Sequence, residues 1–446
     1  MTAGIGLTHS FGYHTARTFG LTPDPLSLRE RTHVTAPSEA LLRPRLAFLP
    51  EVFLVFLRLG LMSFGGPIAH IGYFRAEIVE RRKWIHAETF ADLLALCQFL
   101  PGPASSELGV ALGMTRAGYL GGLAAWIGFT APSALAMIAF AYGIGRVAHP
   151  ETMAFLHGLK ILAVAVVARA VWAMAKNLCP DRERATLAVG AAILVLVFPS
   201  AQGQIAAILL GGYLGWRFLP AETKPEPAER LAPLVSRPVA IGAFILFVLL
   251  LVLPSFAASV TGDRTTLLFA NFYRTGALVF GGGHVVLPLL QEAVVQTGFV
   301  GKEAFLSGYG AAQAVPGPLF SFAAFLGAVA NDALSGWRGG LFCLIAIYLP
   351  SFLLLFSALP FWEQLRREPQ AQATLKGVNA VVVGLLAAAL YTPVFTTAVR
   401  TPGDFGLALI CWLLLEIWRA PPALVALFAA LAAEALGLLR YFFLIG

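Results

Sequence analysis

The chain has 446 residues and a formal net charge of +7, and 58% of its residues are apolar whereas only 12% are charged. This charged share is roughly half of that in an ordinary soluble domain, which excludes a set of soluble domains with polar surfaces. The basic residues lie between apolar segments and form no stripe interleaved with aromatic residues, which excludes a typical nucleic-acid-binding protein. The composition instead predicts an integral protein of the lipid bilayer.

Residues 1–45 contain scattered arginine, proline, threonine and histidine but no uninterrupted apolar run. A signal peptide needs such a run, and arginines beside an apolar segment favour the cytoplasmic side of a membrane. We therefore expect residues 1–45 to form a disordered cytoplasmic tail.

Apolar segments with short joins fill the rest of the chain, and a polar linker over 220–238 divides them into two groups. The first group comprises 51–72, 89–113, 119–145, 155–176, 185–199 and 203–219. The second comprises 239–256, 266–290, 304–330, 338–360, 374–398, 404–418 and 421–443. A bilayer-spanning helix needs about 20 apolar residues, so the sequence predicts an all-α polytopic membrane protein with about 10–13 transmembrane helices. The lower number applies if the short members of 185–219 and 404–443 form shallow hairpins.

The two groups carry the same motifs in the same order, namely Arg-x-Gly, Phe-Gly-Gly, Gln-x-x-Pro-Gly-Pro, Gly-Gly and Pro-Ser. The first group contains Arg58, Gly65, Gly66, Gln98, Pro101, Gly102, Pro103, Gly121, Gly122, Pro132 and Ser133. The second contains Arg274, Gly281, Gly282, Gln313, Pro316, Gly317, Pro318, Gly339, Gly340, Pro350 and Ser351. Such an ordered series indicates a duplication, with repeats over 46–219 and 257–446 and with a linker plus an extra transmembrane helix over 220–256.

The first repeat is expected to cross the membrane six or four times, and 239–256 adds one crossing. An odd total reverses the second repeat, so the repeats are predicted to be inverted, as in many transporters. A cytoplasmic N-terminus places most joins rich in Lys and Arg on the inner side. The join with Arg75, Arg81, Arg82 and Lys83 disagrees; a re-entrant 51–72 would correct it but would upset the later joins.

Each Pro-Gly-Pro motif is expected to break its helix, because proline lacks an N–H and glycine adds backbone freedom. Broken membrane helices are tolerated where they line a protein cavity, often a substrate site. The following half-helix begins with unpaired N–H groups and a positive dipole end, to which Ser105, Ser106 and Ser321 add hydroxyl groups. The two breaks together predict a site for a small anion, with a proline kink as the alternative for either break alone.

Arg58 and Arg274 occupy equivalent positions in apolar segments, where a central charge costs about 2.5–3.5 kcal/mol. A guanidinium presents a planar set of donors suited to oxyanions, so both are candidate substrate ligands; snorkelling or pairing with a carboxylate is the alternative. Glu107 has no acidic counterpart in the second repeat and is a candidate proton carrier or the static counter-ion of Arg58. Lys160 is either a second cavity cation or an interfacial lysine.

Gln98 and Gln313, which precede the breaks, and the Gly-Gly pairs, which allow close approach of a ligand or of another helix, complete the candidate site. Glu303, like Glu88, is expected to cap a helix start, and His70 is given no function. The four cysteines stand apart in the sequence, so no disulfide framework, metal site or cofactor is predicted.

The duplicated run Arg-x-Gly-x-x-x-Phe-Gly-Gly and Gln-x-x-Pro-Gly-Pro resembles the chromate ion transporter family in its long, two-domain form. The resemblance extends from the end of the tail to the C-terminus. It implies a multi-pass protein of the bacterial inner membrane, with a homodimer as one option, that exports chromate. Export would be driven by the proton motive force and would confer chromate resistance.

The residues alone support transport of a small oxyanion by alternating access. A carrier of sulfate or another oxyanion is the nearest alternative, because sulfate and chromate are both tetrahedral dianions. An anion channel would need a continuous pore lined by rings of charge, which paired helix breaks fit less well. An enzyme that reduces chromate would need a redox centre, which the sequence does not predict, so the chain is expected not to be an enzyme.

Overall fold

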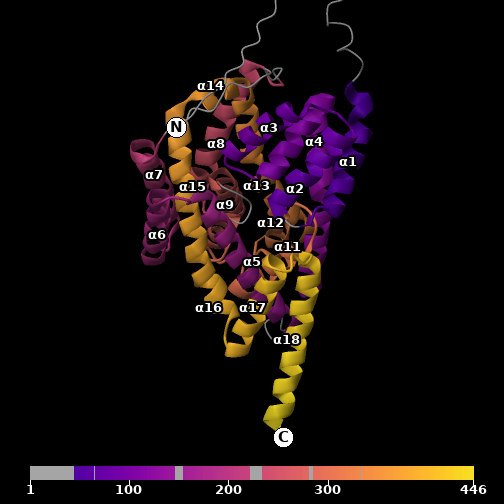
Figure 1. Ribbon diagram of the computed structural model, residues 1–446, viewed down its shortest axis with the longest axis vertical. Helices are drawn as coiled ribbons and strands as arrows, with labels where there is room; N and C mark the ends of the chain where they lie inside the picture. Colours follow the sequence, from indigo (N-terminus) through magenta and orange to yellow (C-terminus); the bar gives the residue numbers. More distant parts are fainter. Residues whose placement is uncertain are drawn as a thin grey trace, which may run out of the picture. The chain divides into compact units, whose positions relative to one another are not determined.

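The computed structural model describes residues 45–64, 66–145, 154–220, 234–280, 285–332 and 334–445. In these residues the chain forms helices joined by short turns, without a β-strand (Figure 1). The tail predicted over residues 1–45 lies outside the described residues except for Arg45. Most of the polar linker, residues 221–233, lies outside them as well.

The order of the helices repeats between the two halves, which confirms the predicted duplication. The first half contains the 3-10 turn Arg45–Phe48 and α1 (Leu49–Met62), α2 (Gly66–Phe74), the π-helix η4 (Arg75–Arg81), α3 (Ala87–Phe99), α4 (Ala104–Gly145), α5 (Ala154–Leu178), α6 (Arg182–Val197) and α7 (Ala201–Phe218). The extra helix is α8 (Arg237–Thr261). The second half contains α9 (Arg264–Leu278), α10 (Val286–Val294), α11 (Lys302–Ala314), η7 (Leu319–Ser321), α12 (Phe322–Val329), α13 (Gly336–Ala358), η8 (Leu359–Phe361), α14 (Trp362–Arg367), α15 (Pro369–Ala389), η9 (Leu390–Phe395), α16 (Thr396–Ala398), α17 (Pro402–Glu416) and α18 (Pro422–Ile445).

Proline and glycine end the helices where the sequence predicts. The first Pro-Gly-Pro motif separates α3 from α4, and the second separates α11 from η7. Gly102 and Gly317 adopt φ angles of 149° and 114°, which L side chains rarely adopt. Within α4 the backbone leaves helical geometry at Ala117 and Gly118, so α4 has two arms, equivalent to α12 and α13 in the second half.

In the first half the chain twice runs from one end of the bundle into its interior and back to the same end. Arg82, which follows η4, makes a 3.1 Å ion pair with Glu51 at the start of α1, so the chain from α1 to η4 returns to the end where it began. Arg116, at the end of the first arm of α4, makes a 3.0 Å ion pair with the same carboxylate, so α3 and this arm also return there. The two segments are therefore re-entrant hairpins. We call the end defined by Glu51, Arg82 and Arg116 the basic end.

The second half forms equivalent hairpins. Thr265, at the start of α9, donates to Asp332 just after α12 at 3.1 Å. The Asn331 N–H donates to the Phe299 carbonyl oxygen, after α10, at 2.8 Å. The start of α9 and the ends of the α10 and α12 segments thus lie together. We call the end defined by Thr265, Phe299 and Asp332 the opposite end.

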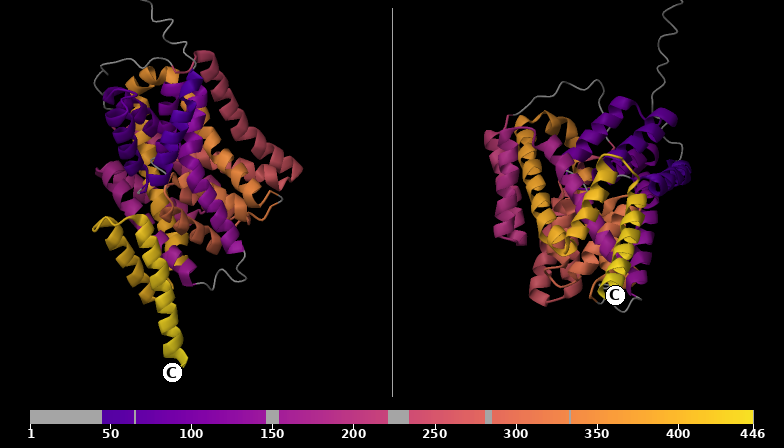
Figure 2. Two further views of the ribbon diagram at one scale, coloured as in Figure 1. Left: turned by 90° about the vertical axis from the view of Figure 1, so that its right-hand side faces the viewer. Right: turned by 60° about the horizontal axis from the view of Figure 1, so that its bottom comes forward.

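Five helices among the described residues are long and apolar enough to cross a membrane, namely α4, α5, α8, α13 and α15. The estimate of about 10–13 helices from the sequence counts the arms of the hairpins separately, because an apolar run looks the same whether it crosses the bilayer or turns back within it. In α8 only 11% of the most apolar window is buried, and Figure 2 (left) shows this helix along the edge of the bundle. The extra helix therefore exposes most of its apolar side chains at the surface of the bundle.

The two halves run in opposite directions and exchange helices. His157, near the start of α5, contacts Asp404 at the start of α17, which follows the end of α15 and α16 at the bottom of Figure 1. At the other end, Lys376 near the start of α15 donates to the Pro220 carbonyl oxygen after α7. The equivalent helices α5 and α15 are thus antiparallel, as expected for inverted repeats. Helix α5 packs against α17 and α18, and α15 packs against α6 and α7.

The re-entrant hairpins explain the position of the basic join over residues 75–83, which disagreed with the topology expected from the sequence. At the basic end lie Arg75, Arg81, Arg82, Lys83, Arg116, Lys176, Arg182, Arg184, Arg217, Arg237 and Lys376. At the opposite end lie Arg264, Lys302, Arg338, Arg400, the buried Lys160 and, near the end of α18, Arg440. Because cytoplasmic loops carry the excess of Lys and Arg, the basic end is predicted to face the cytoplasm.

Single-cysteine labelling tests this orientation. In a background in which Cys179 is replaced by Ser, we expect a cysteine at the exposed Glu80 to react with a membrane-impermeant maleimide only in inside-out vesicles. A cysteine at the exposed Lys302 should react only in right-side-out vesicles. The three other native cysteines are buried, and the labelling of a protein that contains only these three gives the background signal. Labelling of both positions from the same side would contradict the orientation.

Candidate functional site

The tips of the hairpins from both repeats are joined by two equivalent hydrogen bonds. The Gly102 N–H, in the first Pro-Gly-Pro turn, donates to the carbonyl oxygen of Val279 after α9 at 2.7 Å. The Gly317 N–H, in the second turn, donates to the carbonyl oxygen of Ser63 after α1 at 2.9 Å. Each Pro-Gly-Pro turn thus contacts the Phe-Gly-Gly break of the other repeat. We call this meeting point the junction.

The turns approach the junction too closely for a side chain. A Cβ atom added to Gly102 would lie 2.5 Å from Cβ of Ser351 and would also overlap the Glu107 carboxyl group. A Cβ atom added to Gly317 would lie 2.8 Å from Oγ of Ser133. Ser133 and Ser351 belong to the Pro-Ser motifs of the two repeats, so each turn again contacts the repeat to which it does not belong.

Buried polar side chains surround the junction. Ser106 in the first turn of α4 lies 3.4 Å from the hydroxyl of Tyr348 on α13. Ser105 contacts His70 on α2. The Ser63 hydroxyl and both carboxylate oxygens of Glu107 are buried and have no hydrogen-bond partner among the described residues. Buried polar atoms in proteins almost always have a partner, so these atoms are candidates for contact with a ligand or water.

The helix starts at the junction supply unpaired backbone N–H groups. Helix α4 begins at Ala104 directly after one turn, the η7–α12 segment begins at Leu319 directly after the other, and α2 begins at Gly66 beside Ser63. The first N–H groups of a helix lack intrahelical partners, and its N-terminus carries partial positive charge. Several helix starts around buried hydroxyl groups form an environment that favours a small anion.

Arg274 lies beside the junction but not in it. Its guanidinium is partly buried on α9 and donates to Asn271 at 3.0 Å. It lines a small cavity with Gln204 and Glu292, and these two residues also line an adjoining cavity of about 140 Å³. Gln204 is 6% exposed, and its Oε1 atom has no partner among the described residues. The arginine therefore borders a small cavity between α7, α9 and α10, which Gln204, Thr275 and Glu292 also line.

Arg58 does not share the surroundings of Arg274. Its side chain is exposed on α1, and no ion pair with Glu107 is present among the described residues, whereas the sequence allowed that pairing. The equivalent glutamines also differ, because Gln98 is exposed whereas Gln313 is partly buried with an unpaired Nε2 atom. The predicted gathering of both arginines and both glutamines around one anion is not seen in this conformation.

Lys160 lies at the opposite end of the bundle, away from the junction. Its side chain is 1% exposed and pairs with Glu303 at the start of α11, which Arg400 also contacts at 2.8 Å. Lys160 and Glu303 line a cavity of about 230 Å³. The lysine is thus a buried counter-ion of a glutamate in the first turn of α11. The simple interfacial lysine considered from the sequence does not describe it.

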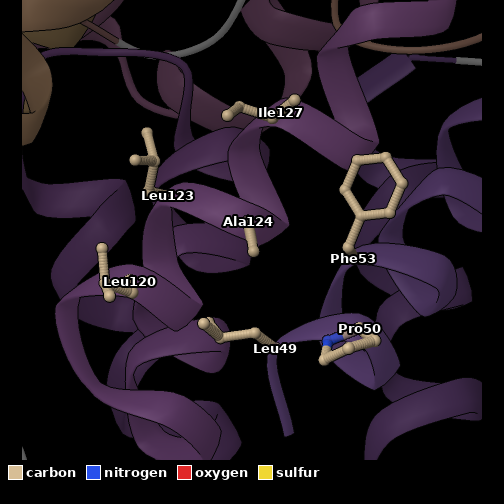
Figure 3. Close-up of a pocket in the computed structure, with 7 residues that line it drawn as sticks. All are labelled: Leu49, Pro50, Phe53, Leu120, Leu123, Ala124 and Ile127. Carbon is tan, nitrogen blue, oxygen red and sulfur yellow. The ribbon is translucent and has the colours of Figure 1, made fainter. Parts of the chain in front are cut away.

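A further cavity of about 370 Å³ lies between α1 and the second arm of α4 (Figure 3). Its lining residues are Leu49, Pro50, Phe53, Leu120, Leu123, Ala124 and Ile127. All of these side chains are apolar, and Leu120 and Leu123 are about half exposed, at 50% and 49%. This cavity suits lipid chains and offers no group for an oxyanion.

Three candidates from the sequence, Gly65, Gly281 and Gly282, lie outside the described residues. Gly66 is described and has a φ of 78°, consistent with a tight backbone turn at the end of α1. Sequence reasoning gave no site role to Ser63, His70, Ser133, Tyr348 and Ser351. The equal spacing of the two Pro-Ser pairs was a signal for Ser133 and Ser351, whereas His70 and Tyr348 become visible only when the repeats are brought together.

Comparison with known proteins identifies two stretches of the chain. Residues 50–216 and 266–434 each match the family model described as chromate transporter. A chromate transport protein of Pseudomonas aeruginosa is 30% identical over 366 residues, covering 79% of this chain and 83% of that protein. A chromate transport protein of Cupriavidus metallidurans is 24% identical over 396 residues, with coverages of 88% and 93%. An uncharacterized transporter of Methanocaldococcus jannaschii is 26% identical over 341 residues, with coverages of 76% and 82%. No solved structure matches the chain.

Proposed function

This chain belongs to the chromate transporter family, and from that premise we propose that it is a secondary carrier that exports chromate across the bacterial inner membrane. The proton motive force drives the export, and the export confers resistance to chromate. The direction and the energy source rest on the family resemblance, whereas the location of the site rests on the geometry of the junction.

The pair of hydrogen bonds from Gly102 to Val279 and from Gly317 to Ser63 is the observation that carries the proposal. These bonds join the tips of inverted hairpins, so the helix starts of both repeats lie beside one another in the interior of the bundle. Inverted repeats with broken helices at their interface are a common design of carriers that alternate access to one central site. A tetrahedral dianion bound there would accept hydrogen bonds from the first backbone N–H groups and from Ser106 and Ser321.

Glu107 is the carboxyl group closest in sequence to this site, and its role is proposed as proton carrier or counter-ion. It is fully buried, in the first turn of α4, and its carboxylate oxygens have no described partner. The ionised form of a carboxyl group in such surroundings is stabilised only when a cation or water reaches it, and otherwise the group takes up a proton. Opening of the junction would supply that contact.

Uptake into inside-out vesicles tests the proposal, because uptake there corresponds to export from the cell. We expect radiolabelled chromate to accumulate with saturation, to be released by an uncoupler and to keep its oxidation state. Sulfate as a competitor distinguishes a chromate carrier from a general oxyanion carrier. Uptake that rises linearly with concentration and ignores the uncoupler would indicate a channel, and the proposal would then be wrong.

A further inference from the structure

The imidazole of His70 joins two of the helix breaks at the junction. The ring is 1% exposed on α2, with Nε2 3.1 Å from the Ser63 carbonyl oxygen and Nδ1 3.3 Å from the Ser105 hydroxyl oxygen. A carbonyl oxygen can only accept a hydrogen bond, so Nε2 carries a hydrogen. In a neutral ring Nδ1 is then an acceptor, and the Ser105 hydroxyl donates its single hydrogen to it.

This arrangement determines what Ser105 can offer to an anion. Ser105 is 3% exposed in the first turn of α4, directly after the Pro-Gly-Pro turn. While its hydrogen points to His70, only oxygen lone pairs remain for a ligand, and lone pairs repel an oxyanion. When the ring takes up a second proton, Nδ1–H donates to Ser105, whose own hydrogen becomes available to the anion. The same proton adds a positive charge nearby.

The second repeat has other residues at the two positions equivalent to His70 and Ser105. Counting from the equivalent Gly-Gly and Pro-Gly-Pro motifs, Val286 stands at the position of His70 and Phe320 at that of Ser105. Both are buried, at 0% and 1% exposed. The hydrogen bond from Gly102 to Val279 nevertheless forms there. The scaffold therefore does not need a histidine and a serine at these positions, which indicates that the pair has a function in the first repeat.

The groups around His70 leave few other sites for a proton. Its ring packs edge-on against Phe129 at 5.3 Å, and α2 packs against α4 and η4. The charged residues of these two elements are Glu107, Arg116, Arg75, Glu77, Glu80 and Arg81. All except Glu107 make ion pairs at the basic end. Glu107 has no described hydrogen bond that links it to a hydroxyl group of the junction, whereas His70 has one.

We propose that His70 is a positioning residue for the transported oxyanion: a proton on its imidazole turns Ser105 from an acceptor into a donor, so that one proton and one tetrahedral oxyanion bind together at the start of α4. The proposal rests on the proposed function. The proton binds at Nδ1 with the anion and leaves with it on the other side. A dianion and one proton carry a single net negative charge, so the membrane potential, which is the electrical component of the proton motive force, drives the pair outward.

The replacement His70→Gln tests this role in the full-length protein. The Gln amide can donate to the Ser63 carbonyl oxygen and accept from Ser105, as the neutral ring does, but it cannot bind the second proton. We measure the KM for chromate uptake and the inhibition constant of sulfate in inside-out vesicles between about pH 6 and about pH 8. Sulfate stays a dianion in this range, so its inhibition constant reports on the protein alone.

For the unmodified protein we expect the sulfate inhibition constant to rise with pH, by up to about tenfold per pH unit for one linked proton. In His70→Gln the constant should no longer depend on pH, and in Ser105→Ala it should depend on pH less than in the unmodified protein, because only the charge of the ring remains. Glu107→Gln should keep the dependence, because in this proposal His70 carries the linked proton and Glu107 acts as the counter-ion. A normal pH dependence in both His70→Gln and Ser105→Ala, or its loss only in Glu107→Gln, would overturn the inference. Absence of chromate uptake by the unmodified protein would instead refute the proposed function.

Discussion

Replacement of Gly102 by Ala is expected to lower the rate of chromate uptake at least about tenfold without preventing membrane insertion. Gly102 has a φ of 149°, and an alanine held at such an angle is strained by about 1–3 kcal/mol. Its Cβ atom would also overlap Ser351 and Glu107. Relief of this overlap must move the turn and weaken the hydrogen bond to Val279, and each 1.4 kcal/mol added to the transport barrier lowers the rate about tenfold. Initial rates of uptake in vesicles with matched protein content measure the effect.

Replacements of two further glycines provide a second test and a control for this experiment. Gly317→Ala should act in the same direction but less strongly, because the nearest atom to its Cβ is the rotatable hydroxyl oxygen of Ser133. Gly242→Ala in α8 is the matched control, because a Cβ atom there meets no atom within 4 Å. Equal uptake rates for Gly102→Ala and Gly242→Ala would show that the junction is not part of the transport site.

The second large effect is expected for Arg274→Lys, which keeps the positive charge but should lower kcat/KM for chromate by about ten- to hundredfold. Arg274 is partly buried, donates to Asn271 and lines the cavity that contains Gln204. A lysine keeps the charge but loses the planar set of donors, and a hydrogen bond to a charged group contributes about 1.5–3 kcal/mol. We interpret this cavity as the part of the pathway that leads to the junction from the opposite end, and uptake kinetics in vesicles measure the loss.

Arg58→Lys is the matched control for this prediction, because the two arginines occupy equivalent positions in the repeats. Arg58 is exposed on α1, so we expect its replacement to change uptake by less than about threefold, within the range of surface substitutions. Equal losses at the two positions would contradict the assignment of a cavity role to Arg274 alone. They would favour a site that contains both arginines in another conformation of the carrier.

The sequence predicted the elements of the junction but not how they meet. The order of the repeated motifs indicated the duplication, and Pro101 and Pro316 indicated where helices end, because proline has the same local effect in any fold. The re-entrant course of the chain was beyond this reasoning. It depends on Arg82 and Arg116 reaching Glu51, a contact between residues 31 and 65 positions apart, and an apolar run carries no sign of it.

Contacts between distant parts of the chain also explain why candidate residues that are equivalent in sequence have different surroundings in the structure. Arg58 and Arg274 are equivalent in sequence, yet Arg58 is exposed on α1 whereas Arg274 borders a small cavity to which α7 supplies Gln204. His70 looked like an isolated histidine because its partner Ser105 is 35 residues away. Sequence symmetry therefore indicates which residues are equivalent, whereas the neighbours supplied by the other repeat decide what each residue can do.

The central claim is that a tetrahedral oxyanion binds at the junction between the two Pro-Gly-Pro turns. Crystals of the full-length protein soaked with chromate would test this directly, since X-ray data at the chromium absorption edge locate the anion by its anomalous scattering. We predict a peak beside the first turns of α4 and η7, within hydrogen-bonding distance of Ser106 or Ser321. A peak only in the cavity of Arg274, with none at the junction, would contradict the claim.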